Sequence, residues 1–258
     1  MKNRLKTMLH VDFRRMFTMP LIYIMVGACL VMPILILVMT TMMDGSVSVD
    51  PQTGVETVME GFDSVWQIIG NVSTAEQTMS MDMTAMCNIN LLYFIVSVLV
   101  CLFVSEDFRS GYAKNLFTVR AKKSDYVISK TLVCFAGGVL MILAFFVGSL
   151  VGGAIAGLPF EMVGFGAGNL AMCVAAKMLL MAVFVPIFLI MAVIAKSKAW
   201  LSILLSLMMG MFLFMMIPML SPLDAGIVHV LGCAAGGLLL SCGFGVISSL
   251  TLKKTSLV

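Results

Sequence analysis

Long apolar stretches alternate with shorter polar ones along the whole chain. Six stretches are nearly free of charged side chains, and each is long enough to cross a hydrocarbon core of ~30 Å at about 1.5 Å per helical residue. We therefore predict an all-α membrane protein that forms a single transmembrane domain over residues 1–258. The predicted spans are about residues 20–43, 85–105, 131–158, 169–195, 199–218 and 229–252.

The segment before the first span, residues 1–19, has the spacing of an amphipathic helix. Apolar and polar side chains separate onto two faces at intervals of three and four residues. The apolar face holds Leu5, Met8, Leu9, Phe13, Met16 and Phe17, and the polar face holds Asn3, Lys6, Thr7, His10 and Arg14. We expect this helix to lie in the membrane interface. Because the apolar run that follows is long, we do not expect a cleavable signal peptide.

Basic residues are confined to alternate connections between the spans. If the N-terminus lies inside the cell, every segment on the cytoplasmic side carries Lys or Arg, and the segments on the outer side carry neither. Lys177, in the fourth predicted span, is the single exception among the 16 basic residues. The positive-inside rule then predicts that both the N-terminus and the C-terminus are cytoplasmic.

Composition agrees with a bilayer as the solvent. Hydrophobic residues make up 61% of the chain and charged residues only 11%, whereas a soluble domain carries about a quarter charged residues. The net charge of +3 does not indicate a nucleic-acid partner, because the basic residues are segregated by side. The seven cysteines include no C-x-x-C pair, so we expect no disulfide framework or zinc site.

Motifs for catalysis are absent from the sequence. It contains no G-x-x-x-x-G-K-[ST] phosphate loop, no G-x-S-x-G and no H-E-x-x-H. Its two histidines, His10 and His229, are too few for an intramembrane metalloprotease. We expect no catalytic centre, no metal and no cofactor in this chain.

Lys177 allows two interpretations. Counting back from the cytoplasmic end of its span places it near the outer end of the hydrocarbon core, where its long stem can reach the interface. We favour that interpretation. In the alternative, an internal cavity holds Lys177 beside Glu161, Asp224 or an anionic group of a substrate, since intramembrane ionisable residues often serve function.

The predicted outer segment, residues 44–84, carries seven acidic residues and no Lys or Arg. Such a segment attracts cationic peptides at long range, although acids also simply keep an outer loop solvated, and we favour the second interpretation. The apolar spacing from Val58 to Ile69 predicts a short interfacial helix within it.

Pairs of glycines four residues apart occur in two spans. Such spacing lets helices approach closely, either within one chain or in a dimer, and the pattern does not decide between them. The pairs are Gly148 and Gly152, Gly153 and Gly157, and Gly232 and Gly236.

Residues 106–130 join the second and third predicted spans on the cytoplasmic side. Phe108, Tyr112, Leu116 and Val119 have helical spacing, which predicts an apolar stripe on a short helix flanked by cations. Ser124 is a candidate N-cap for the helix that continues into the third span. A helix of this kind is a docking surface for a soluble partner.

This segment resembles the connection between the second and third spans in the ABC-2 family of ABC exporter permeases. Members of that family show an acidic residue followed by a pattern like G-T-x-K-N-L-x-x-x-G-x-x-R-x-x-Y-x-x-S-K. The matching residues are Glu106, Gly111, Lys114, Asn115, Leu116, Tyr126, Ser129 and Lys130. The departures are Tyr112 in place of Thr, Arg120 near the usual Gly and Lys123 near the usual Arg. The amphipathic entry helix and the six spans agree with the same family.

The resemblance implies a permease of the bacterial plasma membrane without its own ATPase site. A second permease, either another copy or a paralogue, would complete the substrate path, and a separate ABC ATP-binding subunit would bind ATP and Mg. The coupling residues would be Glu106, Phe108, Gly111, Tyr112, Lys114, Asn115, Leu116, Arg120, Tyr126 and Lys130. Methionine-rich spans and the acidic outer segment favour an amphipathic substrate, such as an antimicrobial peptide, or a hydrophobic drug.

Two other function classes remain open. One is a non-transporting immunity or sensor protein that binds a peptide at the acidic outer segment. The other, an intramembrane enzyme, is weak because paired catalytic groups are missing from the spans.

Overall fold

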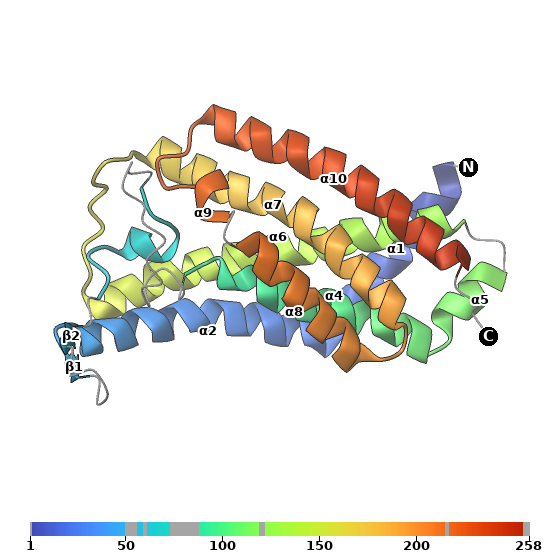
Figure 1. Cartoon of the computed structure of the whole chain (residues 1–258), viewed down its shortest axis with the longest axis horizontal. Coiled ribbons are helices and arrows are strands. Elements are labelled where there is room, and N and C mark those ends of the chain that lie inside the picture. Colours follow the sequence, from blue (N-terminus) through green and yellow to red (C-terminus); the bar gives the residue numbers. More distant parts are fainter. Residues whose placement is uncertain are drawn as a thin grey trace.

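The computed structural model describes residues 2–49, 56–58, 61–72, 88–118, 122–214 and 217–254. Over these residues the chain is a bundle of long helices that lie side by side (Figure 1). The first described residues, from Lys2, and the last, up to Lys254, lie at one end of the bundle, together with the short helix α5 (Tyr112–Thr118) (Figure 1). A small β-hairpin and a 3-10 turn lie at the other end (Figure 1).

The described elements include nine helices. The helices are α1 (Lys2–Thr18), α2 (Pro20–Met43), α4 (Leu91–Arg109), α5 (Tyr112–Thr118), α6 (Lys123–Ala156), α7 (Ala167–Ala195), α8 (Ala199–Phe214), α9 (Ile217–Leu220) and α10 (Ile227–Lys254). The remaining elements are the 3-10 turn η1 (Val65–Ile68) and the strands β1 (Val47–Val49) and β2 (Glu56–Val58).

Five of the described helices are long and apolar enough to cross a membrane. They are α2, α4, α6, α7 and α10. The predicted span at 199–218 corresponds to α8 and α9, and α8 has 16 residues. A helix of that length covers only about 24 Å, less than a hydrocarbon core of ~30 Å. Five predicted spans are therefore present as long helices, and the sixth stays a prediction.

Helix α6 begins earlier than the sequence predicts. It starts at Lys123 instead of near residue 131, so Lys130 lies inside a helix and not in a polar connection. Lys122 occupies the N-cap without a side-chain hydrogen bond. The predicted cap at Ser124 is therefore wrong, because the helix already includes that residue.

The predicted helix between Val58 and Ile69 is also wrong. Strand β2 ends at Val58 and pairs antiparallel with β1, and η1 contributes a single turn. The backbone amide of Val65 donates to the Pro159 carbonyl over 3.2 Å. The Trp66 indole donates to the Phe160 carbonyl over 3.0 Å, so η1 is tied to the connection between α6 and α7.

Glycines of α6 let α2 pack closely against it. A methyl group on Gly148 would overlap the Leu30 carbonyl oxygen, and one on Gly152 would lie 2.8 Å from the Ile34 Cα. These contacts confirm the interpretation that the spacing serves packing within the chain. In α10, by contrast, a methyl group on Gly232 or Gly236 would meet nothing within 4 Å.

Helix α7 lies at the centre of the bundle. In its most apolar stretch 72% of the residues are buried, against 22% in α2 and 11% in α10. The outer helices therefore expose wide apolar faces, which is the arrangement that a lipid environment requires.

Candidate functional site

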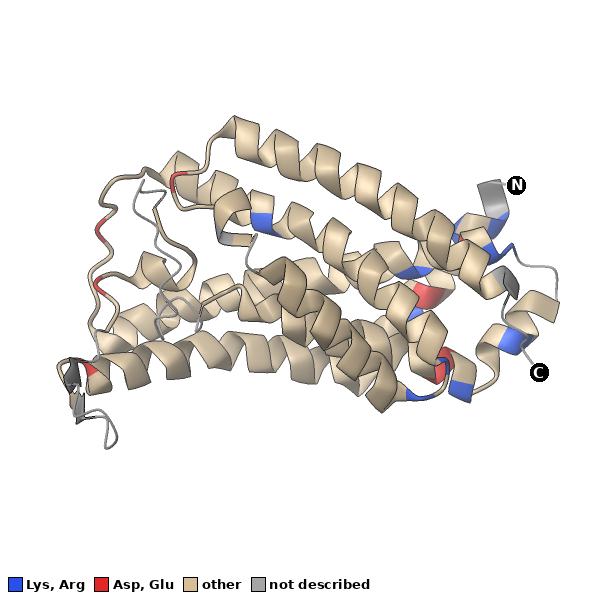
Figure 2. Cartoon of the chain, in the orientation of Figure 1, with Lys and Arg blue, Asp and Glu red and all other residues tan. Residues whose placement is uncertain are grey.

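Basic residues are unevenly distributed between the two ends of the bundle. Lys and Arg gather, together with some acidic residues, at the end that carries α5, whereas acidic residues occupy connections at the opposite end (Figure 2). We call these the basic end and the acidic end. This separation in space agrees with the separation along the sequence.

A buried group of ion pairs lies at the basic end, centred on Lys130 of α6. The Lys130 Nζ lies 2.9 Å from Asp12 Oδ1 and 2.6 Å from Asp107 Oδ2, and all three side chains are 0% exposed. The Arg15 guanidinium lies 2.7 Å from Asp107 Oδ1. These four residues, which we call the Lys130 network, connect α1, α4 and α6.

Hydroxyl groups of α6 complete the network. The Ser129 hydroxyl donates to Asp12 Oδ2 over 2.6 Å, and the Tyr126 hydroxyl donates to Asp107 Oδ2 over 2.9 Å. Two carboxylates thus face two cations, with further hydrogen bonds to the carboxylate oxygens. Full pairing of this kind is what offsets the large cost of removing charges from water.

Aromatic rings surround the cations of the network. The Arg15 guanidinium carbon lies 4.0 Å from the centre of the Tyr112 ring, and the Lys130 Nζ lies 4.0 Å from the centre of the Phe103 ring. Each cation–π contact contributes about 0.5–2 kcal/mol. Burial raises the pKa of the Tyr112 hydroxyl, and the charge of Asp12 raises it further, so the phenol stays neutral at physiological pH.

Tyr112 is the first residue of α5, so the network holds α5 as well. Gly111 precedes it with a φ of +74°, a left-handed conformation that glycine adopts without strain. The chain turns there, which places Phe108 on α4 and Tyr112 on α5. The predicted single stripe is therefore split, because one helix does not continue through Gly111.

The rest of α5 presents a polar surface at the basic end. Ala113 faces inward and is buried, whereas Lys114, Asn115 and Thr118 are exposed. Leu116 is half-buried against the core. A short helix with one anchored face and one free face is suited to contact a partner.

The ten residues predicted for coupling thus fall into groups. Tyr112, Tyr126 and Lys130 meet in or around the Lys130 network, and Lys114 and Asn115 face outward. Glu106 is half-exposed and lies 3.5 Å from Arg109, Phe108 and Leu116 are partly buried against the apolar core, and Gly111 lies in the turn before α5. Arg120 lies outside the described residues.

Sequence reasoning missed Asp12, Arg15 and Asp107. Asp12 carried a readable signal, because it lies four residues from both Met8 and Met16 and therefore shares the apolar face of α1. Asp12 and Asp107 are buried, and Arg15 is partly buried. A carboxylate on such a face requires a buried cation as its partner.

Lys177 lies in α7, closer to the acidic end, and is 1% exposed. Its ammonium donates to Asn90 Oδ1 over 3.1 Å and to Ser221 Oγ over 3.0 Å, and both acceptors are neutral. The favoured expectation that its stem reaches the outer interface is therefore wrong, because α4 and the segment after α9 enclose it.

The two acids considered beside Lys177 lie on connections at the acidic end. Glu161 is exposed between α6 and α7. Asp224 is half-buried before α10, and its backbone carbonyl accepts a hydrogen bond from Asn169 over 3.2 Å.

Long apolar helices around a central helix define a multi-pass helical membrane protein. The profile of the family described as ABC-2 family transporter protein matches residues 14–213. Because this match covers most of the chain, the protein belongs to the ABC-2 transporter family. No curated protein and no solved structure matches the chain. Membrane subunits of this family normally carry no ATPase site, which resides on a separate subunit.

Proposed function

We propose that this chain is the permease subunit of an ABC exporter in the bacterial plasma membrane. It forms the substrate path with a second permease, either another copy or a paralogue. A separate ABC ATP-binding subunit binds ATP and Mg and supplies the energy. The observation that carries this proposal is the exposed helix α5, held by a buried charge network that reaches three other helices.

The orientation of the chain supports a partner at α5. Lys and Arg gather at the basic end (Figure 2), and cytoplasmic segments of membrane proteins are enriched in these residues. The proposal therefore puts both chain ends and α5 in the cytoplasm. A cytoplasmic ATP-binding subunit then meets the exposed face of α5 formed by Lys114, Asn115 and Thr118.

Movement of α5 would reach the spans through the Lys130 network. Tyr112 contacts Arg15 of α1, Arg15 pairs with Asp107 of α4, and Asp107 pairs with Lys130 of α6. Separating Asp107 from Lys130, which are both fully buried, is costly, so α4 and α6 are expected to move together. Nucleotide-driven closure of the partner would then bias a rigid-body rearrangement of the spans.

The substrate that we propose is an amphipathic peptide or a hydrophobic drug. The chain contains 26 methionines, a flexible side chain that suits variable apolar partners. The acidic residues of segment 44–84 add a long-range attraction for cationic peptides.

The test replaces the exposed face of α5 and leaves the network intact. In membranes reconstituted with the ATP-binding subunit, Lys114→Glu combined with Asn115→Ala should lower the ATPase stimulation by the permease about tenfold, a loss near 1.4 kcal/mol of coupling. Lys198→Glu is the matched control, because Lys198 is also exposed at the basic end but lies in the turn before α8.

The control variant should stimulate the ATPase as the wild type does, and both variants should insert into the membrane. Full stimulation by the double variant would show that α5 is not the coupling helix.

A further inference from the structure

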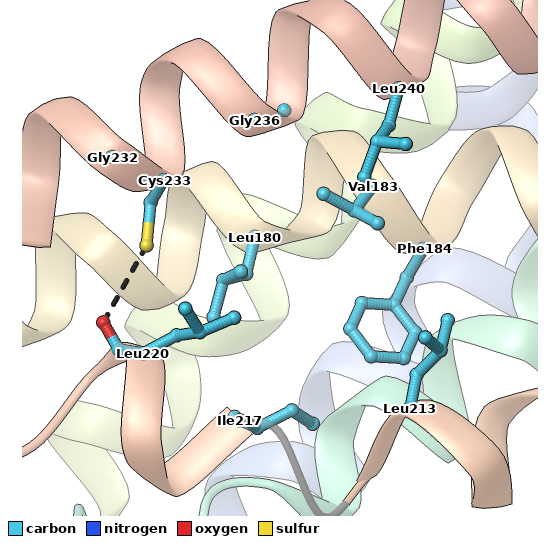
Figure 3. A pocket seen from close by; sticks show the side chains of 11 residues that line it. Leu180, Val183, Phe184, Leu213, Ile217, Leu220, Gly232, Cys233, Gly236 and Leu240 are labelled. Atoms are coloured by element: carbon cyan, nitrogen blue, oxygen red, sulfur yellow. Dashed lines mark hydrogen bonds between the residues drawn. The ribbon is translucent and has the colours of Figure 1, made fainter.

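An apolar pocket of about 230 Å³ lies between α7, α9 and α10. Leu180 and Phe184 of α7, Ile217 and Leu220 at the ends of α9, and Gly236 of α10 border it (Figure 3). This volume is smaller than the 300–1,000 Å³ typical of sites for drug-sized ligands. The pocket therefore suits an alkyl chain or one large apolar side chain better than a whole drug.

Two neighbouring glycines of α10 have opposite roles at this pocket. A methyl group on Gly237 would lie 3.2 Å from the Leu179 carbonyl oxygen, so Gly237 brings α10 close to α7. A methyl group on Gly236 would meet nothing within 4 Å, because its Cα faces the open pocket. Helix α10 therefore packs closely on α7 at Gly237 and leaves the pocket open at Gly236.

Lys177 lies directly behind the wall that α9 forms. Lys177, Leu180 and Phe184 share one face of α7, at spacings of three and four residues. Ser221, which accepts a hydrogen bond from Lys177, follows Leu220 and donates to the Ile217 carbonyl over 2.9 Å. The ammonium and the pocket are thus separated by one turn of chain.

Cys233 of α10 contacts α9 at this pocket. Its thiol lines the pocket and donates to the Leu220 carbonyl over 3.6 Å (Figure 3). The Leu220 carbonyl that accepts this hydrogen bond belongs to the residue before Ser221, the partner of Lys177.

The partners of Lys177 differ from those of Lys130, which is also buried. Lys130 pairs with two carboxylates, whereas the ammonium of Lys177 donates to an amide oxygen and a hydroxyl. An anionic oxygen would add the attraction between two opposite charges, which the neutral oxygens of Asn90 and Ser221 do not supply. An anion that reached Lys177 would therefore displace Ser221 at a gain in interaction energy.

We propose that this pocket binds an anionic amphiphile with a single alkyl chain. The chain occupies the space beside Leu180, Phe184 and Gly236. The phosphate or carboxylate head accepts a hydrogen bond from Lys177 in place of the Ser221 hydroxyl. The further step, that such an amphiphile is exported, rests on the proposed function, whereas binding does not.

The test uses the purified chain in nanodiscs of phosphatidylcholine, with empty nanodiscs subtracted. The probes are dodecyl phosphate and dodecyltrimethylammonium, which share a chain and differ in head charge. Calorimetry should show that the wild type binds dodecyl phosphate at least about tenfold more tightly than dodecyltrimethylammonium. Lys177→Met should remove this preference, and Lys177→Arg should keep it, because both replacements are long but only arginine is charged.

A second pair of variants tests the pocket itself. Gly236→Leu fills it and should weaken both probes about tenfold or more. Gly243→Leu is the matched control, because a methyl group on Gly243 also meets nothing within 4 Å but Gly243 does not line the pocket. The control should bind both probes as the wild type does.

A charge preference that survives in Lys177→Met would overturn the role of Lys177. If Gly236→Leu bound both probes as the wild type does, the pocket would not be their binding site. This result does not depend on whether the Lys177 variants fold. Because no ATP-binding subunit is present, failure here leaves the proposed coupling at α5 intact.

Discussion

Two lysines in the described part of the chain are buried, and their surroundings give them different properties. Lys130 faces the carboxylates of Asp12 and Asp107 and the ring of Phe103. Lys177 faces the neutral oxygens of Asn90 and Ser221. The first arrangement holds helices together at fixed positions, whereas the second leaves a charge able to take a new partner.

Removing the charge at residue 130 should destabilise the protein. Lys130→Met leaves Asp12 without its cation in a fully buried position, and breaking a buried ion pair in this way costs about 3–5 kcal/mol. Thermal unfolding of the purified protein in mild detergent measures the loss. Lys198→Met, at an exposed site of the same end, should leave the unfolding midpoint unchanged.

The double variant Asp12→Asn with Lys130→Met provides the internal check. It removes both charges of that pair, so it should be more stable than Lys130→Met alone. A Lys130→Met protein as stable as the wild type would contradict a structural role for the network.

At the scale of elements, α5 depends on its attachment to α1. Tyr112 begins the helix and stacks on Arg15, while the left-handed Gly111 sets the turn from α4. Without that contact a helix of seven residues has little to hold it, since isolated helices this short are unstable in water.

Tyr112→Ala should therefore uncouple the permease from its partner. The side chain that contacts Arg15 is lost, so a push on α5 no longer reaches α1, and ATPase stimulation should fall several-fold while membrane insertion persists. Tyr112→Phe keeps the ring over the guanidinium and should retain most of the stimulation. Equal ATPase stimulation by Tyr112→Ala and Tyr112→Phe would show that coupling does not depend on the cation–π contact.

The same elements show how far sequence reasoning extends. Five long spans could be predicted, because an uninterrupted apolar run has few other solutions in a membrane protein. The start of α6 could not, because Lys130 reads as a polar loop residue until Asp12 and Asp107 neutralise it. The split at Gly111 and the pairing of β1 with β2 depend on local backbone conformation, which apolar periodicity does not encode.

For the site, the sequence predicts the segment that forms much of the Lys130 network but not the residues of α1 that pair with it. Residues 106–130 were singled out, and Tyr112, Tyr126 and Lys130 do meet in space. Their partners on α1 lie about a hundred residues away in sequence, and only the fold brings them together. The position of Asp12 on an apolar face was the one local sign of that contact.

For the whole molecule, the distribution of charges and the exposed apolar faces both agree with a helical bundle that crosses a membrane. The basic end gathers Lys and Arg around α5, and α2 and α10 leave wide apolar faces along the bundle (Figures 1 and 2). In the function that we propose, this layout would offer an ATP-binding partner the exposed helix α5 in the cytoplasm. The chain would then contribute the path and the moving spans, and the partner would contribute the energy.

The most direct measurement of this account is purification of the tagged chain from its native membrane in mild detergent, followed by identification of the proteins that remain bound. The wild type should retain an ABC ATP-binding subunit, and the combined Lys114→Glu and Asn115→Ala variant should lose it while Lys198→Glu keeps it. Absence of such a subunit from the wild-type preparation, or its equal retention by the α5 variant, would contradict the account.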